Sequence, residues 1–171
     1  GFCEIYEGQQ MNDASFRDIE WTGDALVLLD QRRLPVEEDY VTCTTWQEVA
    51  DAIKTMVVRG APAIGITAAY GVALAVRKTE IHDLPDVIGA AIGGLGETRP
   101  TAINLFWALD RMGARLSGVT TDAFKVAERE AIAIHTEDRE MCAAMGRHGA
   151  ELLPKGTRVL THCNAGALAT G

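Results

Sequence analysis

The 171-residue chain has a net charge of −8, with 24 Asp and Glu against 16 Lys and Arg, so it would repel a phosphate backbone and we expect no nucleic-acid partner. Hydrophobic residues make up 47% and charged residues 23%, which is typical of a globular protein and excludes a disordered chain. The longest apolar run, 61–76, is shorter than the ~20 residues of a membrane-spanning helix and contains proline and glycine, so we expect no membrane association.

The first part of the chain is typical of β structure. Residues 1–10 fit poorly with the rest of the chain, and we interpret them as a tag or extension before Met11. The segment FRDIEW (16–21) alternates, residues 22–24 suit a turn, and ALVLLD (25–30) continues as a second strand. A third short strand is expected near Tyr40–Cys43. Together these segments predict a small antiparallel sheet.

From Thr45 onward the periodicity is helical. Thr45 and Glu48 have capping-box spacing, and apolar residues then recur at helical intervals. The next helix is expected to begin at Ala61, with Pro62 in its first turn, and to be central because it is apolar on every side. Further helices are predicted over residues 84–95, 100–116 and 121–152. On the apolar stripe of the last helix lie Asp138 and His148, which we expect local hydrogen bonds to satisfy.

A change of architecture is predicted after Pro154-Lys155-Gly156. RVLTH (158–162) is typical of a strand, and CNAGALATG (163–171) of a loop that turns into a helix. A parallel sheet needs several strands, which the chain does not supply. We therefore predict an α/β fold, with a β-hairpin and helical-bundle domain over 11–152, followed by the first strand of a truncated Rossmann-like domain over 153–171.

Two segments place an arginine before a predicted helix. In Arg59-Gly60-Ala61-Pro62, the unpaired N–H groups of the helix start and the planar guanidinium would form an anion site. The segment 98–101, with Arg99 before Pro100, repeats this arrangement. The alternative for both is an ordinary helix start, whose arginine points into solvent or pairs with a carboxylate.

A third segment, His162-Cys163-Asn164-Ala165-Gly166, comes directly after the predicted strand. Ligands of open α/β sheets bind at the carboxyl ends of strands, which makes Cys163 a candidate reactive thiol. The alternative is a packed, inert cysteine. The loop has neither Walker A nor GxGxxG spacing, so a nucleotide is not expected.

Metal binding has little support. The four cysteines form no CxxC pair, and His135 has neither HExxH nor ExxH spacing to the carboxylates around it, which suit a solvated helix face. We expect no metal and no cofactor. Because no secretory signal is found, we expect free thiols in the cytoplasm.

Three blocks in this order carry a resemblance: RGAPAIGITAAYG (59–71), TRPTAINLFWALDRM (98–112) and THCNAGALATG (161–171). Together they resemble the methylthioribose-1-phosphate isomerase family, which are aldose–ketose isomerases of methionine salvage. The resemblance implies a sugar-phosphate substrate and a homodimer. It also implies that Arg59, Gly60, Ala61 and Arg99 bind substrate and that Cys163 is catalytic.

The family's catalytic Asp lies further downstream, so the resemblance implies a chain that is incomplete and inactive alone. Two relatives of the same fold stay open as alternatives. One is ribose-1,5-bisphosphate isomerase, and the other is a non-catalytic regulatory subunit of the translation-initiation exchange-factor type. The presence of Cys163 together with both arginine segments argues against the regulatory protein.

Overall fold

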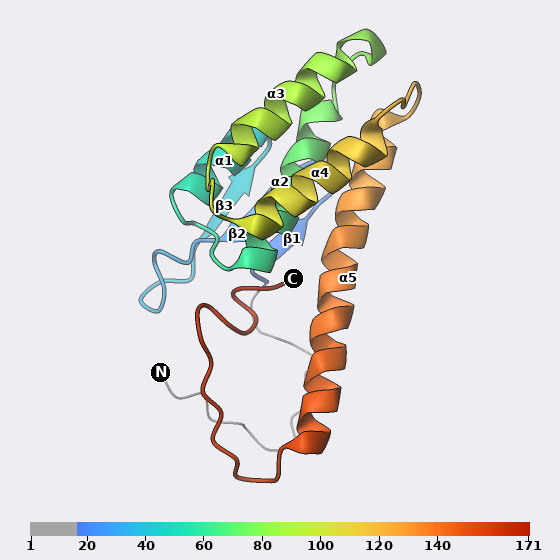
Figure 1. The fold of residues 1–171 in the computed structure, drawn as a ribbon. Helices are drawn as coiled ribbons and strands as arrows, with labels where there is room; N and C mark the ends of the chain where they lie inside the picture. The colour runs from blue at the N-terminus through green and yellow to red at the C-terminus, as the bar shows by residue number, and fades with distance from the viewer. Residues whose placement is uncertain (1–16) are drawn as a thin grey trace.

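The computed structural model describes residues 17–171, so the interpretation of residues 1–10 lies outside the described part. Figure 1 shows a small sheet at one side of a bundle of helices, one of which is much longer than the rest. The sheet has the order β1 (Ile19–Trp21), β2 (Leu26–Leu29) and β3 (Tyr40–Cys43), and both pairings are antiparallel. The predicted antiparallel sheet is confirmed.

The sheet is closed by a tight turn and buries its central strand. The Thr22 amide donates to the Ala25 carbonyl over 3.0 Å, which joins β1 to β2. In β2, Leu26 and Leu28 share one face of the strand and are fully buried in the core that the sheet forms with the helices, and Leu29 is buried as well.

Helix α1 (Trp46–Lys54) begins with the predicted capping box. The Glu48 amide donates to the Thr45 hydroxyl over 3.3 Å, and the Thr45 amide donates to the Glu48 carboxylate over 3.0 Å. Two backbone donors that the helix itself leaves unpaired are thereby satisfied.

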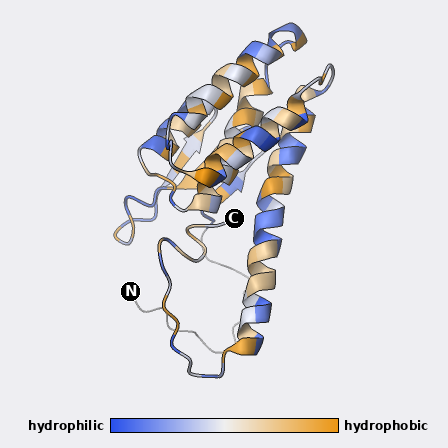
Figure 2. Ribbon diagram, in the orientation of Figure 1, coloured by the Kyte–Doolittle hydropathy of each residue, from blue (hydrophilic) through white to orange (hydrophobic). Residues whose placement is uncertain are grey.

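Helix α2 (Ala61–Val76) is the centre of the bundle, and α1, α3, α4 and α5 all contact it. Figure 2 shows its hydrophobic character in the interior. Close approach to α4 depends on Gly65, because a Cβ there would lie 2.8 Å from the Asn104 carbonyl oxygen. The predicted central helix is confirmed.

The remaining helices are α3 (Leu84–Gly96), preceded by the short 3-10 helix η1 (Ile81–Asp83), α4 (Ile103–Leu116) and α5 (Ala123–Leu152). The first half of α5 packs on α2 and α4, whereas its second half extends beyond the bundle (Figure 1). No helix within residues 17–171 has both the length and the apolarity to cross a membrane.

Two predicted elements differ from the structure. Residues 158–162 form no strand and are exposed, Leu160 to 97%, because an extended segment without a neighbouring strand has no partner for its backbone groups. The expected helix start after Cys163 is also absent, and a turn around residues 167–168 stands in its place. The division of the chain at residue 152 stays a prediction.

Candidate functional site

The first predicted segment forms a sharp corner before α2. Gly60 is the N-cap of this helix with φ 95°, a conformation that side chains with a Cβ rarely adopt. Pro62 lies in the first turn, where its missing N–H costs no hydrogen bond. The backbone of Gly60 and Ala61 is thus turned sharply where the positive end of α2 begins.

The third segment returns to this corner and packs against it. The Ala63 amide donates to the Ala169 carbonyl over 3.1 Å, and the Gln31 side-chain amide donates to the Leu168 carbonyl over 2.7 Å. A Cβ on Gly60 would lie 2.5 Å from the Ala169 Cα, so the two backbones touch. The structure therefore joins the first and third sequence blocks directly, and Ala63's N–H is already used within the protein.

Arg59 precedes this corner and is half-buried. Its Nε is buried and has no hydrogen-bond partner, and no carboxylate of residues 17–171 lies within ion-pair distance of its guanidinium. The alternative of a carboxylate-paired arginine is therefore wrong within the described chain. An unpaired, partly desolvated guanidinium is suited to bind an anion.

Arg99 lies in a turn and not directly before a helix. The Ala102 amide donates to the Arg99 carbonyl over 2.9 Å, which closes a turn with Pro100 at its second position. Helix α4 begins only at Ile103, so the expectation that Pro100 opens the helix is wrong. Arg99 is half-buried and, like Arg59, has no ion pair within the described chain.

The beginning of α4 places the Arg99 turn at the same end of the bundle as the Gly60 corner. The Asn104 carbonyl in the first turn of α4 contacts α2 at Gly65, one turn after Ala61. Figure 1 shows the connection from α3 to α4, the start of α2 and the C-terminal end of the chain at this end of the bundle.

Cys163 is exposed and has φ 65°, a strained conformation for a residue with a side chain. The packed position that the alternative assumed is therefore wrong for the described chain, and the reactivity of the thiol stays a prediction. The turn that meets α2 begins at Gly166, three residues after Cys163, and is closed by a hydrogen bond of 2.9 Å from the Ala169 amide to the Gly166 carbonyl. The thiol thus belongs to the loop whose far end is held at the Gly60 corner.

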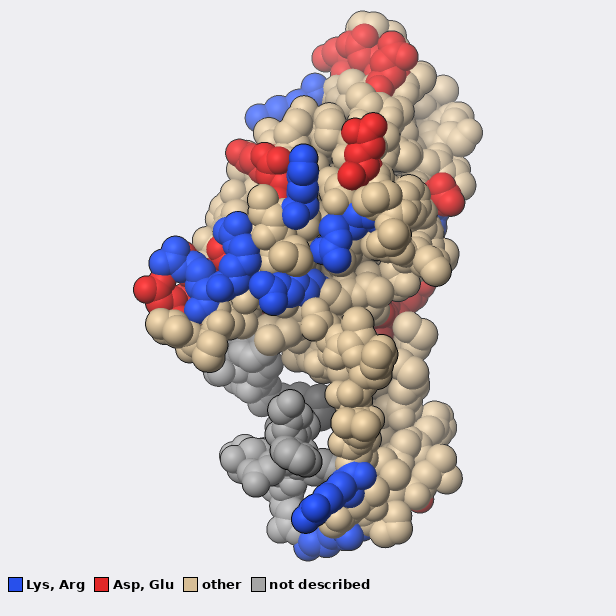
Figure 3. All heavy atoms as spheres, turned by 60° about the vertical axis from the view of Figure 1, so that its left-hand side comes forward, with Lys and Arg blue, Asp and Glu red and all other residues tan. Residues whose placement is uncertain are grey.

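Basic side chains gather on one face in spite of the net charge of −8. Figure 3 shows Lys and Arg side chains across the middle of the side where the β2–β3 connection lies, with acidic side chains at the top and also among them. In this connection Arg32 pairs with Asp30, and Arg33 pairs with Glu37 and Asp39, so these arginines are compensated within the protein.

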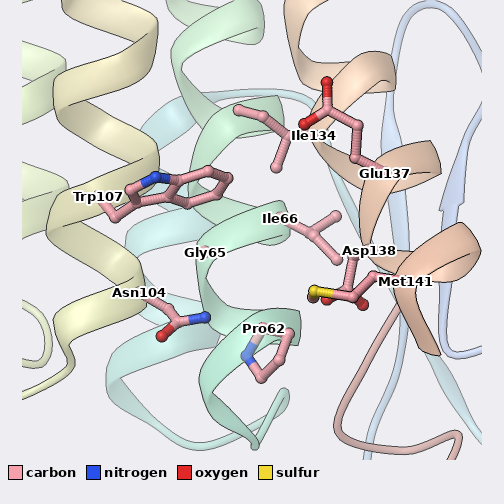
Figure 4. Close-up of a pocket in the computed structure, with 9 residues that line it drawn as sticks. All are labelled: Pro62, Gly65, Ile66, Asn104, Trp107, Ile134, Glu137, Asp138 and Met141. Carbon is pink, nitrogen blue, oxygen red and sulfur yellow. The ribbon is translucent and has the colours of Figure 1, made fainter. Parts of the chain in front are cut away.

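A cavity of about 270 Å³ lies beside the same end of α2. It is lined by Pro62, Gly65, Ile66, Asn104, Trp107, Ile134, Glu137, Asp138 and Met141. Figure 4 shows Trp107 extending from α4 towards Ile66 and Ile134. None of the predicted site residues lines this cavity, and its two carboxylates make it unsuited to a phosphate.

Sequence reasoning missed a half-buried aromatic and imidazole cluster. Trp21 stacks on Tyr70 at 5.1 Å between ring centroids, and the Tyr70 hydroxyl is hydrogen-bonded to His135 Nδ1 at 3.0 Å. Burial raises the pKa of Tyr70 to about 12. Burial, and then the charge of Arg139, lowers the pKa of His135. Both groups are therefore neutral near pH 7. The sequence signal that could have indicated this cluster was the position of His135 on the buried stripe of α5.

The carboxylates near His135 are not all solvated, contrary to the expectation from the sequence. Arg111 donates to Glu130 over 2.6 Å and to Glu137 over 2.5 Å, and its guanidinium lies 5.5 Å from the Trp107 ring centroid. These contacts join α4 to α5 beside the cavity. Within residues 17–171, no group of three or more His, Cys, Asp or Glu side chains could hold a metal ion.

Asp18 makes stability depend on pH. Burial raises its pKa to about 6, although backbone amides and the charge of Arg139 oppose this, and its Oδ2 is buried without a hydrogen-bond partner in the described chain. A carboxyl with a raised folded-state pKa stabilises the fold below its unfolded pKa, and this contribution is lost as pH rises through 6. We expect Asp18→Asn to gain stability relative to the wild type between pH 4 and pH 7, measured by urea unfolding. A constant difference across this range would contradict the expectation.

Comparison with known proteins matches the chain to one family, and the two relatives described below have the same name. Residues 57–170 match the Initiation factor 2 subunit family. The methylthioribose-1-phosphate isomerase of Fervidobacterium nodosum is 54% identical over 159 residues, which are 89% of this chain and 45% of that protein. The enzyme of the same name from Koribacter versatilis is 48% identical over 167 residues, which are 94% of this chain and 47% of that protein.

Two solved structures have the same fold. The 5-methylthioribose 1-phosphate isomerase of Pyrococcus horikoshii matches with a TM-score of 0.82 and 41% identity, over 90% of this chain and 45% of that one. The translation initiation factor eIF-2B subunit delta of A. fulgidus matches with a TM-score of 0.80 and 42% identity, over 90% of this chain and 46% of that one. The chain spans about half the length of the curated relatives it matches.

Proposed function

Because the chain belongs to the Initiation factor 2 subunit family, we propose that it is the N-terminal half of an isomerase that converts the aldose 5-methylthioribose 1-phosphate into the ketose 5-methylthioribulose 1-phosphate, a step of methionine salvage. The observation that carries the proposal is Arg59, which is half-buried before the N-terminus of α2 and has no ion pair within residues 17–171. Such a position favours an anion, and a sugar phosphate supplies one.

The phosphate is bound, in this proposal, by Arg59 and Arg99 together with the backbone at Gly60 and Ala61. Since Ala63's N–H is used by Ala169, the backbone contribution comes from the residues before Pro62. The arginine side chains therefore provide most of the charge that the phosphate requires. Arg99 reaches the ligand from the turn before α4, at the same end of the bundle.

The chemistry requires further groups. The anomeric oxygen of the substrate carries the phosphate, so the ring opens only when an acid protonates the ring oxygen. Hydrogen then moves from C2 to C1, and donors fixed around the developing charge lower the barrier by about 3–4 kcal/mol each. We assign Cys163 to the reacting carbons, with a downstream Asp as proton donor. The 171-residue chain alone is then inactive.

An isomerase assay of the longer protein tests the proposal. We expect Arg59→Ala to raise KM for methylthioribose 1-phosphate by about 10- to 100-fold, because a charge-assisted hydrogen bond contributes about 1.5–3 kcal/mol. Arg59→Lys should recover part of the loss. The control is Arg17→Ala, since Arg17 is exposed and paired with Glu20. Absence of ketose formation by the unmodified protein would refute the function, and an unchanged KM would refute the role of Arg59.

Two other functions remain to be compared in the same assay. The match to the translation factor subunit favours a non-catalytic regulatory protein as the second candidate. Against it, the relatives from Fervidobacterium nodosum and Koribacter versatilis are both isomerases by name, and Cys163 is exposed rather than packed. A panel that includes ribose 1,5-bisphosphate separates the two isomerase activities. We propose a cytoplasmic homodimer, on the basis of the resemblance alone.

A further inference from the structure

We propose that Asp138 is a positioning residue, which holds the loop of Cys163 at the Gly60 corner through the backbone of Gly171. What the positioned thiol does rests on the proposed function, whereas the hydrogen bond itself does not. Asp138 belongs to α5, far in sequence from the three predicted site segments, and it has no other assigned role.

The contact is direct and protected from water. Asp138 Oδ2 accepts a hydrogen bond from the Gly171 amide over 2.8 Å. The carboxylate is on the bundle side of α5, and the residue is only 8% exposed. Gly171 also packs closely on His135 and Ile66, where an added Cβ would lie 2.5 Å and 3.0 Å from side-chain atoms. A buried carboxylate is costly unless it is paired or hydrogen-bonded. The hydrogen bond from the Gly171 amide therefore stabilises the Asp138 carboxylate in its buried position.

Three separate parts of the fold hold the same short segment. Gln31, from the connection between β2 and β3, donates to the Leu168 carbonyl over 2.7 Å. The first turn of α2 donates through Ala63 to the Ala169 carbonyl over 3.1 Å. Asp138 supplies the third contact and is the only charged group among the three. As a result Ala169 is 2% exposed, although the residues from Thr161 to Gly166 are exposed.

The segment 168–171 restricts the position of the Cys163 thiol, because only a short connection joins the two. The turn from Gly166 to Ala169 is closed by a backbone hydrogen bond of 2.9 Å, and Cys163 lies three residues before it. Cys163 has φ 65°, a conformation that is costly for a residue with a Cβ and so depends on support from the chain that follows it. If Asp138 is lost, the end of the loop is released from α5, and the positions open to the thiol increase.

The test begins with the 171-residue chain and uses no substrate. Hydrogen–deuterium exchange would be measured on the peptide that contains residues 168–171, for the wild type, Asp138→Asn and Asp138→Ala. We expect exchange to rise by about 10-fold or more in Asp138→Ala, and by less in Asp138→Asn, whose amide oxygen can still accept. The matched control is Glu137→Gln, which changes the neighbouring carboxylate, because Glu137 accepts from Arg111 of α4 and not from the 168–171 segment.

The second measurement uses the longer protein and separates positioning from general stability. We expect Asp138→Ala to lower kcat at least 10-fold with KM within about twofold, and Asp138→Asn to restore part of kcat. Unchanged exchange of 168–171 in a folded Asp138→Ala variant would overturn the proposal, as would an unchanged kcat of that variant. If the unmodified longer protein shows no isomerase activity, the proposed function fails, and the exchange experiment still decides whether Asp138 holds the segment.

Discussion

Replacement of Cys163 by alanine in the longer protein is expected to reduce kcat by at least about 100-fold while substrate binding stays largely intact. The thiol is exposed at the front of a loop whose end is fixed at the Gly60 corner. In the proposed mechanism it acts at C1 and C2 only as charge develops, and groups of this kind contribute about 10²–10⁴-fold. The measurement is steady-state kinetics together with direct binding of the sugar phosphate.

Cys142 offers the matched control for this substitution. It is half-buried on α5, and burial raises its pKa, so it is a poor nucleophile near pH 7. Since the Cys142 thiol donates to Asp138 Oδ2 over 4.0 Å, the control is Cys142→Ser, which keeps a donor there, and we expect it to keep kcat within about threefold. Turnover of the Cys163→Ala variant at the wild-type rate would remove Cys163 from the mechanism, and equal loss in both variants would indicate a general effect on the fold.

Replacement of Gly60 by alanine is expected to destabilise the chain by about 3 kcal/mol or more. Two effects add, because the φ of 95° costs about 1–2 kcal/mol for a residue with a Cβ, and the new methyl group would overlap the Ala169 backbone at 2.5 Å. The second effect also pushes residues 168–171 away from α2. The measurement is the free energy of unfolding in urea.

Gly23 separates the two effects. It has φ 90°, but a Cβ there would have no atom within 4 Å, so Gly23→Ala reports the backbone strain alone. We expect Gly23→Ala to cost about 1–2 kcal/mol. The difference between the variants then measures the contact between Gly60 and Ala169. Equal losses at both positions would show that this contact contributes nothing to stability.

Periodicity was sufficient to predict most of the fold. The three strands, the capping box at Thr45 and the central helix from Ala61 follow from local patterns of apolar and polar residues. These patterns are reliable because each of these elements buries a face that its own sequence defines. The predicted start of α4 at Pro100 was wrong. Pro100 occupies the second position of a turn instead of a first helical turn, and the helix begins at Ile103.

Candidate site residues could be singled out from the sequence, and their roles stay predictions, but the contacts between the segments could not be foreseen. The sequence indicates Arg59, Arg99 and Cys163, yet nothing local shows that Ala169 would meet Gly60 or that Asp138 would bind Gly171. Those contacts join residues far apart in the chain, and one sequence holds no record of such pairing. The strand expected at 158–162 was wrong for the same reason, since a strand is defined by its neighbour and not by its own residues.

The contact between Gly60 and Ala169 also sets an order of events during synthesis. The corner before α2 is translated early, but the carbonyl that accepts the Ala63 amide is supplied only by Ala169. Gln31 is separated from its partner by an even longer stretch of chain, because Leu168 lies 137 positions after it. The nascent chain can therefore form α1 and α2 while it is still being elongated, but the Gly60 corner, where we propose that the phosphate binds, is completed among the last parts of this region.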